Sequence, residues 1–134
     1  MIGRIPLPVA VLLLFAAGTA AGCQPEARTV TITIRYSAFE PAAMTVPRGV
    51  PVTFVLENQD PIDHEWLVGD DDFHAAHRAG THASHGEVPT EVSVPALERA
   101  TTTITFDELG TLAFICHLPA HESYGMVGTL TVSP

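Results

Sequence analysis

Residues 114–132 read FICHLPAHESYGMVGTLTV, a stretch in which apolar, strand-like flanks enclose a cysteine, a histidine and a methionine. Four residues separate Cys116 from His121 and four separate His121 from Met126, while His64 begins the upstream segment HEWLV. One thiolate, two imidazoles and a thioether are the ligands of a mononuclear blue-copper site with a weak axial methionine. Zinc accepts cysteine and histidine but has little use for a thioether. The pattern therefore predicts one copper ion at these four residues.

Alternation along the flanking segments supports this convergence. Cys116 lies in phase with Phe114 and Met126 lies in phase with Leu130, so both sulfur atoms are expected at one end of the same apolar interior. Each ligand also has a simpler interpretation: Cys116 as an inert core thiol, Met126 as core packing, and His64 as a surface residue at the start of a strand. Their occurrence together at these spacings favours the copper site.

The rest of the chain is patterned as short strands. Residues 29–36 (TVTITIRY) and 50–56 (VPVTFVL) alternate apolar and polar side chains and are rich in β-branched residues, as half-buried strands are. No segment shows a sustained apolar repeat of helical period. This pattern predicts an all-β fold, an antiparallel sandwich or a Greek-key barrel. Seven or eight strands are expected, over residues 29–36, 39–46, 50–56, 64–68, 91–94, 100–106, 111–116 and 126–132.

Charge and length exclude other classes of protein. The chain has 134 residues, with 15 acidic and 6 basic residues and a formal net charge of −9. All the basic residues are arginine, and no basic patch that could neutralise phosphates is expected, so nucleic-acid binding is excluded. The length fits one domain with a sizeable core, and a hydrophobic content of 46% is typical of a globular chain.

Residues 1–22 are expected to be a secretory signal peptide, because Arg4 precedes an apolar run at 9–17 that is too short to span a bilayer. The segment AAGC, which ends at Cys23, resembles a bacterial lipoprotein cleavage box. We therefore expect Cys23 to be lipidated and to anchor the exported protein to a membrane of the cell envelope through a tether at 23–28; ordinary cleavage would leave a terminal thiol instead. The folded domain is expected over residues 29–134.

Lipidation of Cys23 would leave Cys116 without a disulfide partner in this chain. Paired cysteines in envelope proteins usually form a disulfide, and a lone thiol in an oxidising compartment is a liability unless something holds it. The cysteine count therefore gives a further indication of a metal.

Residues 70–88 (DDDFHAAHRAGTHASHGEV) interrupt the strand pattern and are expected to form a long, irregular insertion. The histidines of this insertion either lie in a solvated loop without a role or form a second, weaker metal site that captures or hands over copper. The acidic run at its start is either solvated or steers a basic redox partner. Those histidines are His74, His77, His82 and His85.

The segment 114–132, together with HEWLVGD from His64 onward, resembles the cupredoxins, the family of plastocyanin and azurin, and the resemblance covers essentially residues 29–134. It implies an eight-stranded Greek-key sandwich, one type I copper ion and single-electron transfer. It also implies that Cys116, His121 and Met126 are the ligands from the loop and that His64 is the upstream ligand. The His-rich insertion is similar to that of envelope cupredoxins linked to copper tolerance.

Two positions depart from the pattern of that family. Glu65 stands where asparagine is common, and His117 stands where serine or threonine is common; both positions often brace the site through hydrogen bonds. His117 is out of phase with Cys116 and is expected to point outward. In multicopper oxidases and nitrite reductases a histidine at this position contacts a catalytic copper, which requires further histidines from another domain or subunit.

Three functions are compatible with the sequence. The first is a monomeric electron carrier, not an enzyme, that passes single electrons between extracytoplasmic redox proteins. The second is a periplasmic copper-sequestering or copper-delivery protein for copper tolerance, which would rely on the His-rich insertion. The third, an enzyme that uses His117, has the weakest support, because the His-x-His pairs of such enzymes are absent from the sequence.

Overall fold

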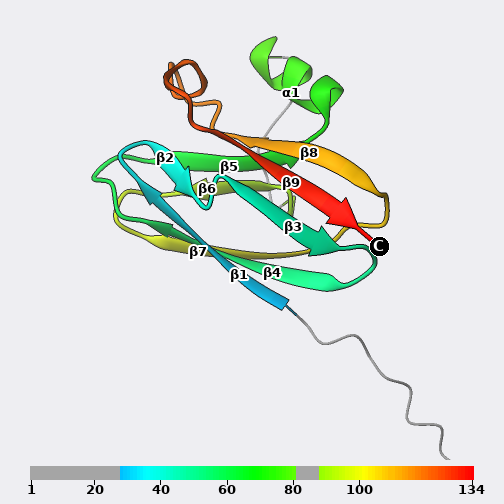
Figure 1. Cartoon of the computed structure of the whole chain (residues 1–134). Helices are drawn as coiled ribbons and strands as arrows, with labels where there is room; N and C mark the ends of the chain where they lie inside the picture. The colour runs from blue at the N-terminus through cyan, green and yellow to red at the C-terminus, as the bar shows by residue number, and fades with distance from the viewer. Residues whose placement is uncertain (1–27, 81–87) are drawn as a thin grey trace, which may run out of the picture.

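The computed structural model describes residues 28–80 and 88–134, and two β-sheets stacked face to face make up most of them (Figure 1). One sheet has the strand order β2-β1-β4-β7 and the other the order β3-β9-β8-β5-β6, so the chain crosses repeatedly between the two layers. The strands are β1 (Arg28–Arg35), β2 (Ala38–Glu40), β3 (Ala43–Pro47), β4 (Pro51–Asn58), β5 (His64–Gly69), β6 (Glu91–Val94), β7 (Arg99–Thr105), β8 (Gly110–Ile115) and β9 (Val127–Ser133), with the helix α1 (Asp71–Arg78) and the 3₁₀-helix η1 (Glu122–Tyr124).

The all-β sandwich predicted from the sequence is confirmed. Nine strands occur in the described residues, because the segment 39–46 divides into β2 and β3, which belong to different sheets. Most neighbouring strands are antiparallel, as expected. The exceptions are the parallel pairs β1–β4 and β3–β9, which arise because the chain leaves a sheet and returns to it in the same direction after a crossover.

Alternating burial along the strands builds the core and fixes the start of β5. In β4, Phe54 and Leu56 are fully buried, and the ring of Phe54 lies 4.8 Å, between centroids, from that of Trp66 in β5. Burial of a large apolar side chain contributes about 1.5–3 kcal/mol, so a slip of β5 by one residue would be costly. Trp66 thus sets the register that turns His64 inward. In the described residues, the other aliphatic and phenylalanine side chains with 0% exposure are Ile32, Ile34, Val52, Val94, Phe114 and Leu130.

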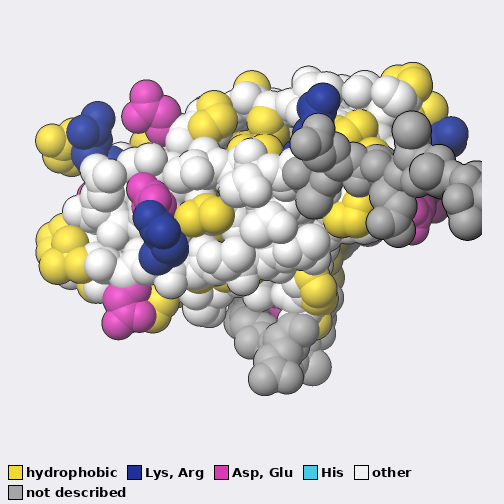
Figure 2. All heavy atoms as spheres, turned by 90° about the horizontal axis from the view of Figure 1, so that it is seen from below, with side chains coloured by type: hydrophobic (Ala, Val, Ile, Leu, Met, Phe, Trp, Pro, Cys, Tyr) yellow, Lys and Arg dark blue, Asp and Glu magenta, His cyan; other side chains and the backbone are white. Residues whose placement is uncertain are grey.

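The outer face of the β2-β1-β4-β7 sheet carries hydroxyl side chains. Figure 2 views this side of the molecule from below and shows it mainly in white, with scattered acidic, basic and hydrophobic side chains. Thr53 of β4 and Thr103 of β7 share a hydrogen bond of 2.9 Å across adjacent strands. The strands are therefore apolar inside and polar outside, which is the alternation read from the sequence.

The insertion at 70–88 contains a helix, which corrects the expectation of an irregular segment. The side chain of Asp70 caps α1 by accepting a hydrogen bond from the backbone N–H of Phe73 at 2.8 Å. Acidic residues in the first turn and Arg78 in the last complement the helix dipole. Eight residues make about two turns, too few for a sustained apolar repeat, so the usable sequence signal was the cap. Figure 1 shows α1 above the β3-β9-β8-β5-β6 sheet.

The predicted signal peptide and almost all of the predicted tether lie outside the described residues, and so do Cys23, His82 and His85. Within residues 28–80 and 88–134, no helix combines the length and the apolar character that a membrane crossing requires.

Gly128 in β9 offers a test of the packing between β9 and its neighbours. A Cβ at this position would overlap the fully buried ring of Phe114 and would lie 2.7 Å from the carbonyl oxygen of Ala42. We expect Gly128→Ala to lower the free energy of unfolding by about 1–3 kcal/mol, because the fully buried ring must shift to admit the methyl group. The exposed neighbour Thr129→Ala should change it by about 0.5 kcal/mol or less. Urea unfolding measures both, and equal midpoints would contradict the expected overlap.

Candidate metal centre

Three side chains from separate parts of the chain converge at one end of the sandwich. His64 opens β5, Cys116 directly follows β8, and His121 immediately precedes η1. Nδ1 of His121 lies 3.2 Å from Sγ of Cys116 and 3.2 Å from Nδ1 of His64. Ligand atoms of the three residues all lie within 4.8 Å of one another. The structure thus brings together three of the four ligands predicted from the sequence.

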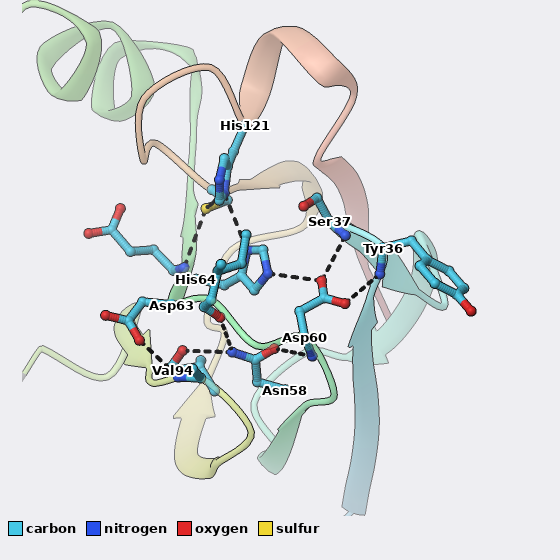
Figure 3. A network of polar contacts seen from close by, with 12 residues as sticks. Tyr36, Ser37, Asn58, Asp60, Asp63, His64, Val94 and His121 are labelled. Atoms are coloured by element: carbon cyan, nitrogen blue, oxygen red, sulfur yellow. Dashed lines mark hydrogen bonds and ion pairs between the residues drawn. The ribbon is translucent and has the colours of Figure 1, made fainter.

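A carboxylate fixes the ring of His64, as Figure 3 shows. Nε2 of His64 donates a hydrogen bond to Oδ2 of Asp60 at 3.0 Å, so in the neutral ring the lone pair remains on Nδ1, the atom that faces His121. Burial lowers the pKa of His64, and this effect outweighs the opposing effect of Asp60. The ring is therefore neutral at neutral pH. His64 is therefore held in the tautomer that a metal ligand needs.

Asp60 is itself held by backbone donors from the turn after β1. The N–H groups of Tyr36 and Ser37 donate to its two carboxylate oxygens at 2.7 and 2.8 Å, and its own N–H donates to the side-chain oxygen of Asn58 at 2.9 Å (Figure 3). Burial alone would raise the pKa of Asp60, but these N–H groups and His64 outweigh it, so the pKa lies below its ordinary value. Sequence reasoning missed Asp60, because an aspartate four residues before a histidine is common in loops.

Cys116 is completely buried, and a backbone donor points at its sulfur. The N–H of Glu65 donates to Sγ at 3.4 Å. Glu65 occupies the position where the resemblance predicts asparagine, yet the contact with sulfur comes from the main chain and does not depend on the side chain. This part of the bracing is therefore compatible with the departure from the family pattern.

Main-chain hydrogen bonds close the loop that carries the remaining ligands. The N–H of Cys116 donates to the carbonyl of Met126 at 3.2 Å, and the N–H of Met126 donates to the carbonyl of His121 at 3.0 Å. Gly125 has a φ of 94°, a left-handed conformation that glycine adopts without strain, and it ends η1. Met126 is fully buried and has its backbone bonded to that of Cys116. Its role as the axial ligand stays a prediction.

The donor set fits copper. Two imidazole nitrogens and a sulfur converge on one point. Met126, whose backbone is hydrogen-bonded to that of Cys116, carries a thioether, which copper accepts as a ligand and zinc does not need. His64 and Cys116 are buried whereas His121 is partly exposed, so the centre reaches solvent on the His121 side. Such a buried, braced set of nitrogen and sulfur ligands is typical of a type I copper site.

Comparison with known proteins agrees with this chemistry. A family model described as "Cupredoxin-like domain" matches residues 7–132. The chain belongs to the cupredoxin-like family. The copper-resistant cuproprotein CopI of Rubrivivax gelatinosus is 36% identical over 120 residues, which cover 86% of this chain and 70% of that protein. Its namesake in Pseudomonas aeruginosa is 29% identical, over 89% of this chain and 83% of that protein.

This cupredoxin is similar in structure to a blue copper protein. Auracyanin A, described as a "blue" copper protein from the green thermophilic photosynthetic bacterium Chloroflexus aurantiacus, superposes with a TM-score of 0.62 and 26% identity over 81% of this chain and 100% of that one. The predicted family and the predicted cofactor, copper, are therefore confirmed. The ligand geometry above shows where this cupredoxin can hold a single copper ion.

The structure corrects the expectation for His117 and places it against His74 and His77 of the insertion. His117 does not point outward: its side chain is only 8% exposed and lies against His74 and His77 of α1. Nδ1 of His74 in α1 lies 2.9 Å from Nε2 of His117, and the ring of His77 stacks on that of His117. Burial lowers the pKa of His74, and burial together with His74 lowers the pKa of His117 to about 4. The sequence could not reveal this grouping, since it depends on a helix shorter than the periodic signal requires.

Copper binding to this cupredoxin is expected to weaken as the pH falls. Burial has the largest effect on the thiol of Cys116 and raises its pKa above the ordinary value of 9.0, although the N–H of Glu65 opposes it. The metal-free protein therefore carries a protonated thiol at neutral pH, and copper must displace that proton. The association constant for Cu(I), measured by competition with a chelator, should rise about tenfold per pH unit above neutrality. A constant that is independent of pH would contradict thiolate ligation.

Proposed function

We propose that this protein is an electron carrier that holds one type I copper ion with His64, Cys116 and His121, with Met126 as a weak axial ligand. The observation that carries the proposal is the prearranged ligand set, in which Asp60 fixes the tautomer of His64. When bound, copper supplies a one-electron couple between Cu(II) and Cu(I). Ligands that are already in place need to move little when the charge changes, which favours rapid electron transfer.

The chain's own residues define how an electron would reach the site. His64 and Cys116 are sealed inside the sandwich, whereas His121 is partly exposed. A redox partner therefore approaches on the His121 side. The formal net charge of −9 supports a partner with a basic docking surface, because opposite charges steer association.

We further propose that the carrier works outside the cytoplasm of a bacterium, attached to the cell envelope through lipid on Cys23. Support comes from the sequence: the signal-like segment at 1–22 and the AAGC box. We propose a monomer that passes electrons between larger redox proteins and turns over no substrate. Mass spectrometry of the protein from a bacterial membrane fraction tests the anchor, since an unmodified Cys23 would contradict it.

Reversible redox cycling of the copper-loaded protein tests the carrier function. The visible absorption of the copper–thiolate bond should bleach on reduction and return on oxidation over repeated cycles, without loss of copper. Asp60→Asn should slow reduction by the same small-molecule reductant at matched driving force, because it removes the carboxylate that fixes His64. The exposed Asp63→Asn is the control and should behave as wild type. Release of copper at each reduction would contradict a carrier.

Copper tolerance is the second candidate, and the names of the two CopI relatives favour it. The site is the same, but the function would be to sequester or deliver copper. A bacterial strain that lacks the gene can be complemented with wild type, Cys116→Ser or a variant of the insertion histidines, and grown with added copper. Tolerance that survives the insertion variant but fails with Cys116→Ser assigns tolerance to the buried site. Normal tolerance in the uncomplemented strain contradicts this function.

A further inference from the structure

We propose that His74 and His117 form a second metal site, which binds a divalent, imidazole-seeking ion, Cu(II) before others, through two nitrogen ligands. His74 comes from α1, and His117 follows Cys116 in the chain. Neither residue belongs to the ligand set of the first site. The inference does not depend on whether the first site transfers electrons or stores copper.

The outer nitrogen of each ring is directed at an acceptor. Nε2 of His74 lies 3.2 Å from the carbonyl oxygen of Ala113, and Nδ1 of His117 lies 3.5 Å from Oε2 of Glu122. An acceptor beside each of these nitrogens favours the tautomers that carry the ring hydrogen there, and in a neutral imidazole the other nitrogen then carries the lone pair. The two inner nitrogens, Nδ1 of His74 and Nε2 of His117, face each other at 2.9 Å. In those tautomers two lone pairs face each other at this distance, and they repel each other unless a hydrogen or a metal ion lies between them.

The separation suits a metal ion. Two nitrogens bound at about 2.0–2.1 Å and at right angles, as in a square-planar site, lie about 2.8–3.0 Å apart. A carbonyl and a carboxylate behind the two rings are also the partners that metal-binding histidines usually have. His64 in the first site shows the same arrangement, with Asp60 behind the ring and Nδ1 turned to the centre. Nitrogen ligands in a square-planar arrangement favour Cu(II).

Several contacts hold the two rings in place. His74 is 1% exposed, and the ring of Phe73 packs edge-on against it at 5.1 Å between centroids. Gly69 leaves room for Phe73, because a Cβ there would overlap the Phe73 ring. Nη2 of Arg78, the last residue of α1, donates to Oε1 of Glu122 at 2.6 Å and ties the helix to the loop of the first site. These contacts keep both rings at the position a metal requires.

His77 provides a matched control on the same helix. Its Nδ1 donates to the carbonyl of Phe73 at 2.9 Å, and its ring lies nearly parallel to that of His117, with 14° between the planes and 5.4 Å between centroids. Because the His77 ring lies nearly parallel to the His117 ring, its nitrogens do not point between Nδ1 of His74 and Nε2 of His117. His77→Gln therefore removes one histidine and leaves the proposed ligands intact.

A second equivalent of Cu(II), added to the copper-loaded full chain, tests the site. The electron paramagnetic resonance spectrum should gain a component with wide copper hyperfine splitting and superhyperfine lines from two nitrogens, distinct from the narrow splitting of a type I site. His74→Gln and His117→Gln should each lose this component. His77→Gln and the double variant His82→Ala/His85→Ala should keep it. The visible band of the first site reports whether each variant is folded.

Other results overturn the proposal. Absence of a second component in wild type shows that the pair shares a proton in an ordinary hydrogen bond. If the second component persists in His74→Gln, or is lost in either control, then other histidines bind the ion. If His117→Gln fails to fold, ring ¹⁵N signals of the wild-type protein, with Cu(I) in the first site and one equivalent of Zn(II), decide. The signals of Nδ1 of His74 and Nε2 of His117 should shift together, and unmoved signals contradict the site.

Discussion

Cys116→Ser is expected to abolish the intense visible absorption of the copper-loaded protein. That absorption comes from charge transfer between a thiolate and Cu(II), and Cys116 supplies the single sulfur anion of the predicted ligand set. Serine is close in size to cysteine and is a far poorer donor to Cu(I). The variant should therefore also bind Cu(I) much more weakly, which chelator competition and absorption spectra measure on the same sample.

Met126→Leu is the matched control for this prediction, because it removes the second sulfur and keeps the size and apolar character of a fully buried side chain. The band should persist with a changed position, and the reduction potential should rise, since loss of a weak axial ligand alters the two oxidation states unequally. A visible band that survives in Cys116→Ser would show that another residue ligates the ion.

Asp60→Ala should lower the free energy of unfolding of the metal-free protein by about 2–5 kcal/mol. The substitution leaves the N–H groups of Tyr36 and Ser37 and the ring N–H of His64 without their acceptor. A buried donor that loses its partner, such as the ring N–H of His64, costs about 1–3 kcal/mol, and the two part-buried N–H groups add to this cost. Urea unfolding at neutral pH gives the value, and a total stability of about 5–15 kcal/mol makes a loss of this size plain.

Asp63→Ala is the control for this substitution. Asp63 is also an aspartate before His64, but it is exposed and accepts one hydrogen bond, from the N–H of Ala96 at 2.8 Å. It should cost about 1 kcal/mol or less. Similar losses of unfolding free energy in the two variants would show that the contacts of Asp60 stabilise the fold no more than that of Asp63.

The pH dependence of stability gives a second check on Asp60. Its folded-state pKa lies below the ordinary value of 3.8, so its stabilising effect is complete above that value and is lost as the pH falls through the folded-state value. The difference in stability between wild type and Asp60→Ala should therefore shrink below about pH 4. A difference that is constant down to strongly acid pH would contradict a charged Asp60.

The strand pattern and the ligand loop were predictable from the sequence because both rest on local periodicity and spacing. β1, β4 and β9 follow the alternation of apolar residues, and Cys116 and His121 lie five positions apart in one loop. The parallel pairing of β1 with β4 was not predictable, since both parallel and antiparallel neighbours give the same alternation.

The surroundings of the ligands depend on contacts between residues distant in sequence. Asp60 is bound to backbone groups 23 and 24 residues away, and His74 meets His117 across 43 residues. No pattern within one segment encodes such pairs. The acidic cap of α1 was visible as Asp70, but its meaning became clear only when the helix was seen to bring His74 over β8.

The turn that follows β1 contributes main-chain groups to the electronic environment of a histidine in another sheet. Tyr36 and Ser37, both with positive φ, hold the carboxylate of Asp60, which in turn holds His64. Substitutions at this surface hairpin that alter the direction of its two amides should therefore change the redox behaviour of a metal that the hairpin never touches. Engineering of the potential can begin at an exposed turn, with every ligand left unchanged.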